Sequence, residues 1–259
     1  MCRLAAYMGP ELPLAQFLFA PAHGLVEQAW NPQELLFGRM NVDGFGIGWY
    51  ADDDRPAVYV SALPIWADVN LPHLGRSLVN DLWLGSVRSA TSGASTDPVN
   101  SQPFCDEELM FMHNGLLEDF GRRVRPSLRQ HLSPDIEAGV RGSTDSEYLF
   151  ALLRHLLADD EELSIEDALA DMSGLIGEWA GTGQALLNVV VTDGERLYAT
   201  RHALNHRCPS LYYTTDDESF PGAQLVASER LTDAAFWQPV PEHHVLVLDP
   251  DEPPELVAL

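Results

Sequence analysis

The residues best suited to chemistry are Met1 and Cys2, at the start of the chain. Removal of the initiator methionine would leave Cys2 with a thiol and a free α-amine. An α-amine titrates near pH 8 and a cysteine thiol about half a unit higher. One residue would then hold a nucleophile and a proton acceptor, as in N-terminal-nucleophile catalysis. A cysteine at position two is more often incidental, so the hypothesis needs partner residues elsewhere.

An arginine and a threonine follow the apolar segment 82–87, which predicts a buried strand. Arg88 comes directly after this strand, and Thr91 follows in the next loop. An arginine that leaves a buried strand needs an anionic partner. One of the 39 acidic residues could supply it. Alternatively, Arg88 and the Thr91 hydroxyl could hold a substrate carboxylate, and the residues alone favour neither interpretation.

The apolar segment 109–112 predicts another strand, ending on a turn at Asn114 and Gly115. These residues are common in ordinary strand-to-loop turns. The alternative is catalytic, because an asparagine amide and the next backbone N–H can converge on one oxygen, as an oxyanion hole requires. The adjacent His113 is the nearest histidine that could act as a base. Its neighbours do not follow the order of a catalytic triad, which favours a packed histidine.

A helix is expected to begin near Thr144, because Thr144 and Glu147 form a capping-box pattern and leucines at helical spacing follow. Asp145 then lies in the first turn. The helix dipole alone can explain an acid at that position. The same carboxylate is also well placed to hold the ammonium group of a ligand.

Glycines alternate with large apolar residues over 44–50. On a strand, Gly44, Gly46 and Gly48 would share one face. A face without side chains lets another backbone or a ligand approach closely, and both interpretations are open. A nucleotide-binding loop is excluded, because Trp49 stands where the G-x-G-x-x-G pattern needs glycine.

The remaining segments supply the elements that must position these residues. We expect strands at 2–8, 44–50, 57–61, 82–87, 109–115, 185–191, 196–201, 210–214, 224–228 and 243–249, followed by a proline-rich acidic tail. We expect helices at about 13–19, from 68 to about 80, within 116–140, from 144, and over 165–179. This mixed order predicts a layered α+β fold, and we expect one domain over 1–259.

Composition narrows the function. The formal net charge of −24 argues against a nucleic-acid partner, since phosphate binding needs a basic surface. The three cysteines, Cys2, Cys105 and Cys208, show no spacing typical of a zinc site or of a disulfide framework. No apolar stretch reaches the length of a membrane span, and no signal peptide is evident. We therefore expect a cytosolic protein with no cofactor and no metal requirement.

Together the polar residues suit a γ-glutamyl group, which carries an α-carboxylate, an α-ammonium and a γ-amide. On these residues the sequence resembles the class II glutamine amidotransferases, which are N-terminal-nucleophile hydrolases. The resemblance covers roughly residues 1–200 and rests on Met1-Cys2, Asn41-x-Asp43-Gly44-x-Gly46-x-Gly48, Arg88-x-Ala90-Thr91-x-Gly93, His113-Asn114-Gly115 and Thr144-Asp145-Ser146-Glu147. It implies a four-layer αββα sandwich.

The resemblance also implies roles for single residues. Cys2 would be the nucleophile, with its own α-amine as base through a water. Asn114 and the Gly115 N–H would form the oxyanion hole. Arg88 and Thr91 would hold the glutamyl carboxylate. Asp145 would hold the ammonium.

We expect no second domain that consumes ammonia, and in this the sequence resembles the stand-alone branch of the family. That branch includes the γ-glutamyl hydrolase of ergothioneine biosynthesis, which acts on γ-glutamyl-hercynylcysteine sulfoxide. It also includes the peptide-degrading subunit of a glutathione-catabolism complex. Three alternatives stay open: a glutaminase subunit that passes ammonia to a partner synthase, degradation of a γ-glutamyl peptide such as glutathione, and an inactive binding protein. A homo-oligomer is equally compatible with the sequence.

Overall fold

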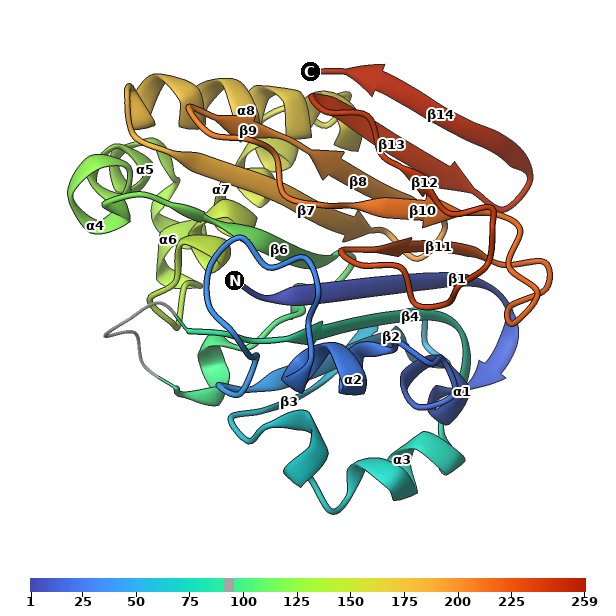
Figure 1. The fold of residues 1–259 in the computed structure, drawn as a ribbon. Coiled ribbons are helices and arrows are strands. Elements are labelled where there is room, and N and C mark those ends of the chain that lie inside the picture. The colour runs from blue at the N-terminus through green and yellow to red at the C-terminus, as the bar shows by residue number, and fades with distance from the viewer. Residues whose placement is uncertain (91–95) are drawn as a thin grey trace.

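A computed structural model describes residues 1–90 and 96–259 of the protein, and its strands form two antiparallel sheets (Figure 1). The first sheet has the order β12 (Gln238–Pro239), β10 (Tyr212–Thr214), β11 (Gln224–Ala227), β1 (Arg3–Pro13), β4 (Val79–Val87), β2 (Phe45–Tyr50) and β3 (Pro56–Ser61). The second has the order β14 (Glu252–Ala258), β13 (His244–Asp249), β8 (Leu197–Arg201), β7 (Ala185–Thr192), β6 (Met110–Leu117) and β5 (Phe104–Cys105), with β9 (Ala203–Leu204) paired to β7.

Helices cover the outer face of each sheet. Beside the first sheet lie α1 (Leu14–Leu18), α2 (Leu25–Trp30), the 3₁₀ turn η1 (Ile65–Ala67) and α3 (Leu71–Ser77). Beside the second lie α4 (Phe120–Arg123), α5 (Arg125–His131), α6 (Pro134–Ala138), α7 (Asp145–Asp159) and α8 (Ile165–Ala180), and the short η2 (Pro98–Asn100) precedes β5.

Three buried clusters hold these layers together. The central cluster joins the facing sides of the two sheets, with Leu84 of β4 and Met112 of β6 among its members. The outer clusters join each sheet to its helices, as Phe17 of α1 and Leu152 of α7 illustrate. Because side chains alternate along a strand, each sheet has one face for each cluster. The expected four-layer αββα sandwich is therefore confirmed.

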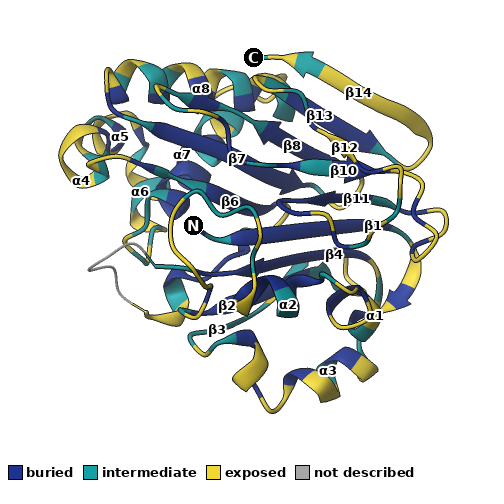
Figure 2. Ribbon diagram, in the orientation of Figure 1, coloured by how far each residue is buried: buried dark blue, intermediate teal, exposed yellow. Residues whose placement is uncertain are grey.

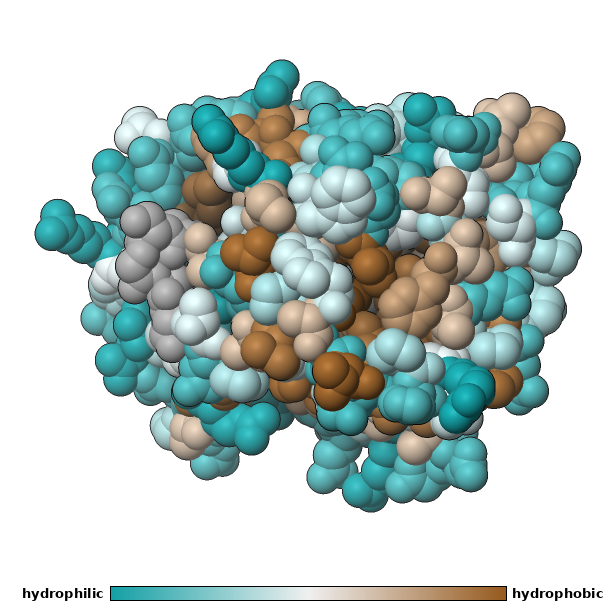
Figure 3. Space-filling view, turned by 60° about the horizontal axis from the view of Figure 1, so that its bottom comes forward, coloured by the Kyte–Doolittle hydropathy of each residue, from teal (hydrophilic) through white to brown (hydrophobic). Residues whose placement is uncertain are grey.

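Exposure follows the same layering. Figure 2 shows buried residues along β1, β4 and β7 in the middle of the molecule, whereas β14 at the sheet edge is mostly exposed. The space-filling view in Figure 3 shows a largely hydrophilic surface, with some apolar residues gathered near the centre of that face. Within the described residues, none of the helices combines the length and apolar character needed to cross a bilayer.

Several predicted boundaries are corrected by the structure. The strand expected at 2–8 continues as β1 to Pro13, and a short helix, α2, forms at Leu25–Trp30, where no helix was expected. The helix expected to run to about residue 80 ends at Ser77, where β4 soon begins. The expected C-terminal tail forms β14, since its backbone pairs with β13. For β1 and β14, pairing between distant segments overrides the local pattern.

The predicted turn at Asn114 and Gly115 is wrong. Both residues lie inside β6, opposite Asn188 and Leu187 of β7. A Cβ atom at Gly115 would overlap the backbone carbonyl of Leu186 and the ring of His113. Glycine is required there because a neighbouring backbone approaches closely, and not because the chain turns.

Candidate active site

One cavity of about 510 Å³ collects most of the sequence-predicted site residues. Cys2, Arg88, Gly115 and Asp145 all line it. They come from the start of β1, the end of β4, β6 and the first turn of α7. Residues from four elements meet here because β1 and β4 are neighbours in one sheet and β6 faces them from the other.

Cys2 lies just before β1 and is half-buried. Its carbonyl oxygen accepts hydrogen bonds from Arg3 Nε, at 2.8 Å, and from Asn114 Nδ2. The Met1 amine donates to the carbonyl of Phe37 at 2.7 Å, in the segment that passes beside the N-terminus in Figure 1. Burial lowers the pKa of this amine. While Met1 is attached, the Cys2 nitrogen is part of a peptide bond and cannot act as a base.

Asn114 is fully buried beside Cys2, outside the lining of the cavity itself. Arg3 Nη2 donates to Asn114 Oδ1 at 3.5 Å, so the amide nitrogen is the end that faces Cys2. Arg3 is in turn paired with Glu229 at 3.2 Å, and both side chains are almost completely buried. A buried charge pair of this kind fixes geometry, because neither partner can leave the other without a large penalty.

Glu229 also ties this pair to the segment beside the N-terminus. Its carboxylate accepts from His23 Nε2 at 2.7 Å and from the backbone N–H groups of Gln33 and Glu34, both at 2.9 Å. Burial alone would raise the pKa of Glu229, but these hydrogen bonds and the Arg3 charge outweigh it, and the pKa is lowered. Glu229 is therefore an anion held by four groups from three segments.

Arg88 is buried at the end of β4, as expected. Its Nη1 donates to the Asp43 carbonyl at 3.2 Å, and its backbone N–H donates to Gly44. The Asp43 carboxylate accepts from the Ala90 N–H at 2.8 Å, which ties the two loops together. Arg88 is one of the residues that line the cavity. Thr91, the second predicted carboxylate donor, falls outside the described residues.

Asp145 occupies the first turn of α7, as predicted. Its Oδ2 accepts from the Leu117 N–H at 2.8 Å and its Oδ1 from the Ser146 N–H at 2.9 Å. Each carboxylate oxygen retains a further acceptor site, so the group can still receive an ammonium. The contact with Leu117 holds the start of α7 against the end of β6.

Half of the predicted capping box is present. Thr144 accepts the Glu147 N–H at 3.2 Å, as an N-cap should. The Glu147 carboxylate does not return to Thr144; it accepts from the backbone N–H groups of Arg141 and Gly142 at 2.8 and 2.7 Å. Glu147 thus orders the loop that leads into the helix.

His113 is a packed histidine. It is buried, its Nε2 lies 2.7 Å from the Leu186 carbonyl and its Nδ1 lies 2.9 Å from the Ser146 hydroxyl. A carbonyl only accepts, so Nε2 carries the proton and Nδ1 accepts from Ser146. Burial lowers the pKa of His113, which agrees with a neutral ring. The side chain links β6 to α7 and has no ring nitrogen left for a substrate.

The glycine face of β2 packs against protein. A Cβ at Gly46 would overlap the Gln102 carbonyl, and one at Gly48 would lie 2.6 Å from Met110 Sδ. Close packing is therefore the correct interpretation of the two that the sequence left open. Because these glycines have no side chain, the segment that contains Gln102 can pack directly against β2. Gln102 lines the cavity and donates to the His113 carbonyl at 3.0 Å.

Sequence reasoning missed Arg3 and Glu229 as members of this site, together with Gln102. A signal was present for Arg3, since an arginine in the apolar segment 3–8 demands a buried acid. Nothing local marked Glu229 as that acid. Among the described residues, the group whose donor atoms could hold a metal is Cys208, Glu242 and His243, which does not line the cavity.

The profile of the family described as "Glutamine amidotransferases class-II" matches residues 36–229. The chain therefore belongs to the class II glutamine amidotransferases and is an amidohydrolase. A solved structure described as a glutamine aminotransferase class-II domain protein from Silicibacter pomeroyi aligns over all of both chains, with a TM-score of 0.71 and 25% identity. The glutamine phosphoribosylpyrophosphate amidotransferase of B. subtilis shares the fold, with a TM-score of 0.66 at 16% identity over 49% of its chain.

Two named relatives span nearly the whole protein. The chain is 29% identical to the gamma-glutamyl-hercynylcysteine sulfoxide hydrolase of Mycolicibacterium smegmatis, covering 95% of each sequence. It is 28% identical to the probable glutamine amidotransferase DUG3 of Saccharomyces cerevisiae, covering 96% of this chain and 82% of that protein.

Proposed function

We propose that this enzyme hydrolyses the γ-glutamyl amide bond of a γ-glutamyl thiol metabolite and releases glutamate through a Cys2 thioester. The observation that carries the proposal is the single cavity lined by Cys2, Arg88, Gly115 and Asp145. It offers a thiol, a cation and an anion to the three functional groups of a γ-glutamyl substrate.

The reaction begins with removal of Met1, which frees the Cys2 α-amine to take the thiol proton through a water. The thiolate attacks the γ-carbonyl carbon, and Asn114 Nδ2 and the Gly115 N–H stabilise the resulting oxyanion. The C–N bond breaks as the leaving amine takes the proton. Water then attacks the thioester, which releases glutamate and restores the thiol.

The glutamyl end is held by charge. The Arg88 guanidinium binds the α-carboxylate, with the Thr91 hydroxyl as a second donor, and Asp145 binds the α-ammonium. Arg3 and Glu229 are positioning residues, since they orient the Asn114 amide without contact to the substrate. No step needs a metal or a cofactor.

The leaving group would lie against the segment 116–122, which lines the same cavity. Glu118 and Asp119 are exposed acids there, and Phe120, whose ring packs against Tyr148, lines the cavity with them. Acids next to an aromatic ring suit a quaternary ammonium, which the hercynyl group carries. This surface and the relative from Mycolicibacterium smegmatis both favour γ-glutamyl-hercynylcysteine sulfoxide. Glutathione, and glutamine with ammonia passed to a partner synthase, are the alternatives.

The test is intact-mass analysis of the purified protein, followed by assays of glutamate release from γ-glutamyl-hercynylcysteine sulfoxide, glutathione and glutamine in parallel. We expect Met1 to be absent and the sulfoxide to be the best substrate. Cys2→Ser is the matched control and should release no glutamate. Retained Met1 in an active enzyme would overturn the mechanism. Preference for glutamine, together with a co-purifying synthase, would replace the substrate assignment by the ammonia-supplying alternative.

A further inference from the structure

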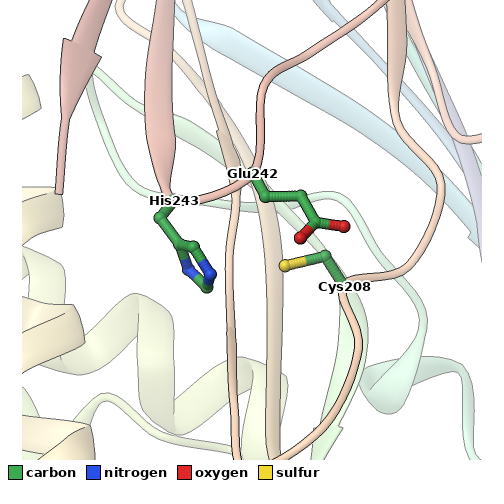
Figure 4. Close-up of side chains that lie close together, drawn as sticks. All are labelled: Cys208, Glu242 and His243. Carbon is green, nitrogen blue, oxygen red and sulfur yellow. The ribbon is translucent and has the colours of Figure 1, made fainter.

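We propose that the protein carries a transition-metal site, separate from the catalytic cavity, in which Cys208, His202, His243 and Glu242 bind one zinc ion. Figure 4 shows Cys208, Glu242 and His243 approaching one another from two separate segments. The site does not depend on the proposed function, and hydrolysis does not require it.

Strand pairing brings the two histidines together. Arg201, at the end of β8, pairs with His244, at the start of β13. Because the strands are antiparallel, the next residues outward are His202 and His243. The backbone N–H of His243 donates to the Arg201 carbonyl at 2.7 Å, which fixes this arrangement. The two imidazole Nδ1 atoms lie 3.0 Å apart.

Cysteine and glutamate complete the group. Donor atoms of Cys208, Glu242 and His243 all lie within 4.8 Å of one another. A tetrahedral zinc ion, with Zn–N near 2.0–2.1 Å and Zn–S near 2.3 Å, places its ligands roughly 3.3–3.7 Å apart. The Cys208, Glu242 and His243 donors therefore need to approach one another by roughly 1 Å to enclose the ion, and His202 would join through its contact with His243. Thiolate, imidazole and carboxylate together favour zinc over magnesium or calcium.

The local charges suit a cation. The Glu242 carboxylate brings a negative charge to the cluster, and the Nδ1 atoms of His202 and His243 face each other, as ring nitrogens that share one ion would. Two neutral rings can share one proton between their facing nitrogens, or both can direct lone pairs at a metal. Burial and the Glu242 charge raise the pKa of the Cys208 thiol, so metal binding would release a proton from it.

Arg201 is the competing cation, since its Nη2 lies 3.5 Å from the Glu242 carboxylate. This is the weakest of its contacts, because Arg201 also donates to the Pro209 and Val240 carbonyls at 2.9 and 2.8 Å. Glu242 is half-exposed, so it can turn from Arg201 to the ion. Glu242 and His243 are both exposed whereas Cys208 is buried, so the Cys208 thiolate is the ligand held most firmly by the fold.

The test uses untagged full-length Cys2→Ser protein, because the catalytic thiol and its α-amine could chelate zinc themselves. Zinc is titrated against a chromophoric chelator, and Co²⁺ is added separately as a spectroscopic probe. We expect one ion per chain and a thiolate-to-Co²⁺ charge-transfer band. Adding Cys208→Ser should abolish the band and weaken zinc binding at least tenfold, and adding His202→Gln should weaken it at least tenfold.

Cys105→Ser is the matched control, because Cys105 is the other cysteine away from the active site and should change neither readout. Equal zinc affinity with and without Cys208 would overturn the proposal. The proposal would also be overturned if the folded Cys2→Ser protein bound Co²⁺ without the charge-transfer band, or if it bound no zinc. Both measurements use the Cys2→Ser protein alone, so they do not depend on whether the Cys208 or His202 variants fold. Cys208→Ser in the otherwise native enzyme should leave glutamate release unchanged.

Discussion

Arg3 donates to the side-chain oxygen of Asn114 at 3.5 Å, across the boundary between the two sheets. This contact decides which end of the Asn114 amide faces Cys2. Asn114 Nδ2 binds the Cys2 carbonyl, so this donor already points at the residue that we propose as the nucleophile. An oxyanion donor oriented before the substrate arrives costs no reorganisation during the reaction.

Replacement of Asn114 by alanine should lower kcat by about a hundred- to a thousand-fold, because one oxyanion donor is lost. Steady-state glutamate release measures this, and KM should change little. Asn188→Ala is the matched control, since Asn188 is a buried asparagine directly opposite in β7. It should lower the melting temperature and leave kcat near that of the native enzyme. Equal losses of kcat in both variants would show that the effect of Asn114 is structural.

Glu229→Gln should lower both stability and kcat. Arg3 then remains buried without a counter-ion, which costs about 3–5 kcal/mol, and the Asn114 amide loses its orientation. Arg3→Met/Glu229→Gln should melt at a higher temperature than Glu229→Gln alone, because the unpaired charge is gone, yet remain slow. Recovery of kcat along with stability would rule out a positioning role. Asp217→Asn, at a buried acid outside this network, serves as control.

Asp145→Asn should reduce kcat/KM by roughly 10- to 100-fold through KM, since a charge-assisted hydrogen bond to the substrate ammonium is lost. The asparagine oxygen can still accept from the Leu117 N–H, so the fold should survive. Asp135→Asn, in the first turn of α6, changes a comparable helix acid outside the cavity. An unchanged KM in Asp145→Asn would contradict the assignment.

Gly115→Ala should prevent normal folding, because its methyl group would overlap the Leu186 carbonyl inside the β6–β7 pairing. Gly174→Ala is the control variant. Gly174 lies in α8, and a Cβ atom there would have no neighbour within 4 Å among the described residues outside the backbone of its own helix. It should be neutral or stabilise the protein by up to about 1 kcal/mol. Soluble yield and thermal unfolding distinguish the two. A stable Gly115→Ala protein would disprove the close approach.

Stability should fall as the pH is lowered from about 6.5 towards 4. The pKa of His202 is lowered from 6.5 to about 4, so in this range the unfolded chain binds a proton that the folded chain does not. His202 therefore contributes stability above pH 6.5 that is lost as pH falls through its folded pKa. Urea unfolding at several pH values, with a chelator present, should show a smaller decrease for His202→Gln. An identical pH dependence would refute this.

Local sequence patterns predicted many of the helices and strands, because these elements depend on interactions between residues that are close in sequence. The alternation over 44–50 became β2, the segments 185–191 and 196–201 became β7 and β8, and the Thr144 pattern placed the start of α7. These features depend on residues a few positions apart. The same locality made Asn114 and Gly115 read as a turn, whereas pairing with β7, more than 70 residues later, keeps them extended.

The sequence by itself predicted the residue types of the proposed γ-glutamyl site, the layered fold of the protein and the family to which the chain belongs. Only the tertiary structure decided that Cys2, Arg88, Gly115 and Asp145 share one cavity. It also revealed that Arg3 is paired with Glu229, 226 positions away. The stacking of the two sheets determines which buried charges become partners, because an unpaired buried charge is too costly. No local sequence pattern specifies these partners.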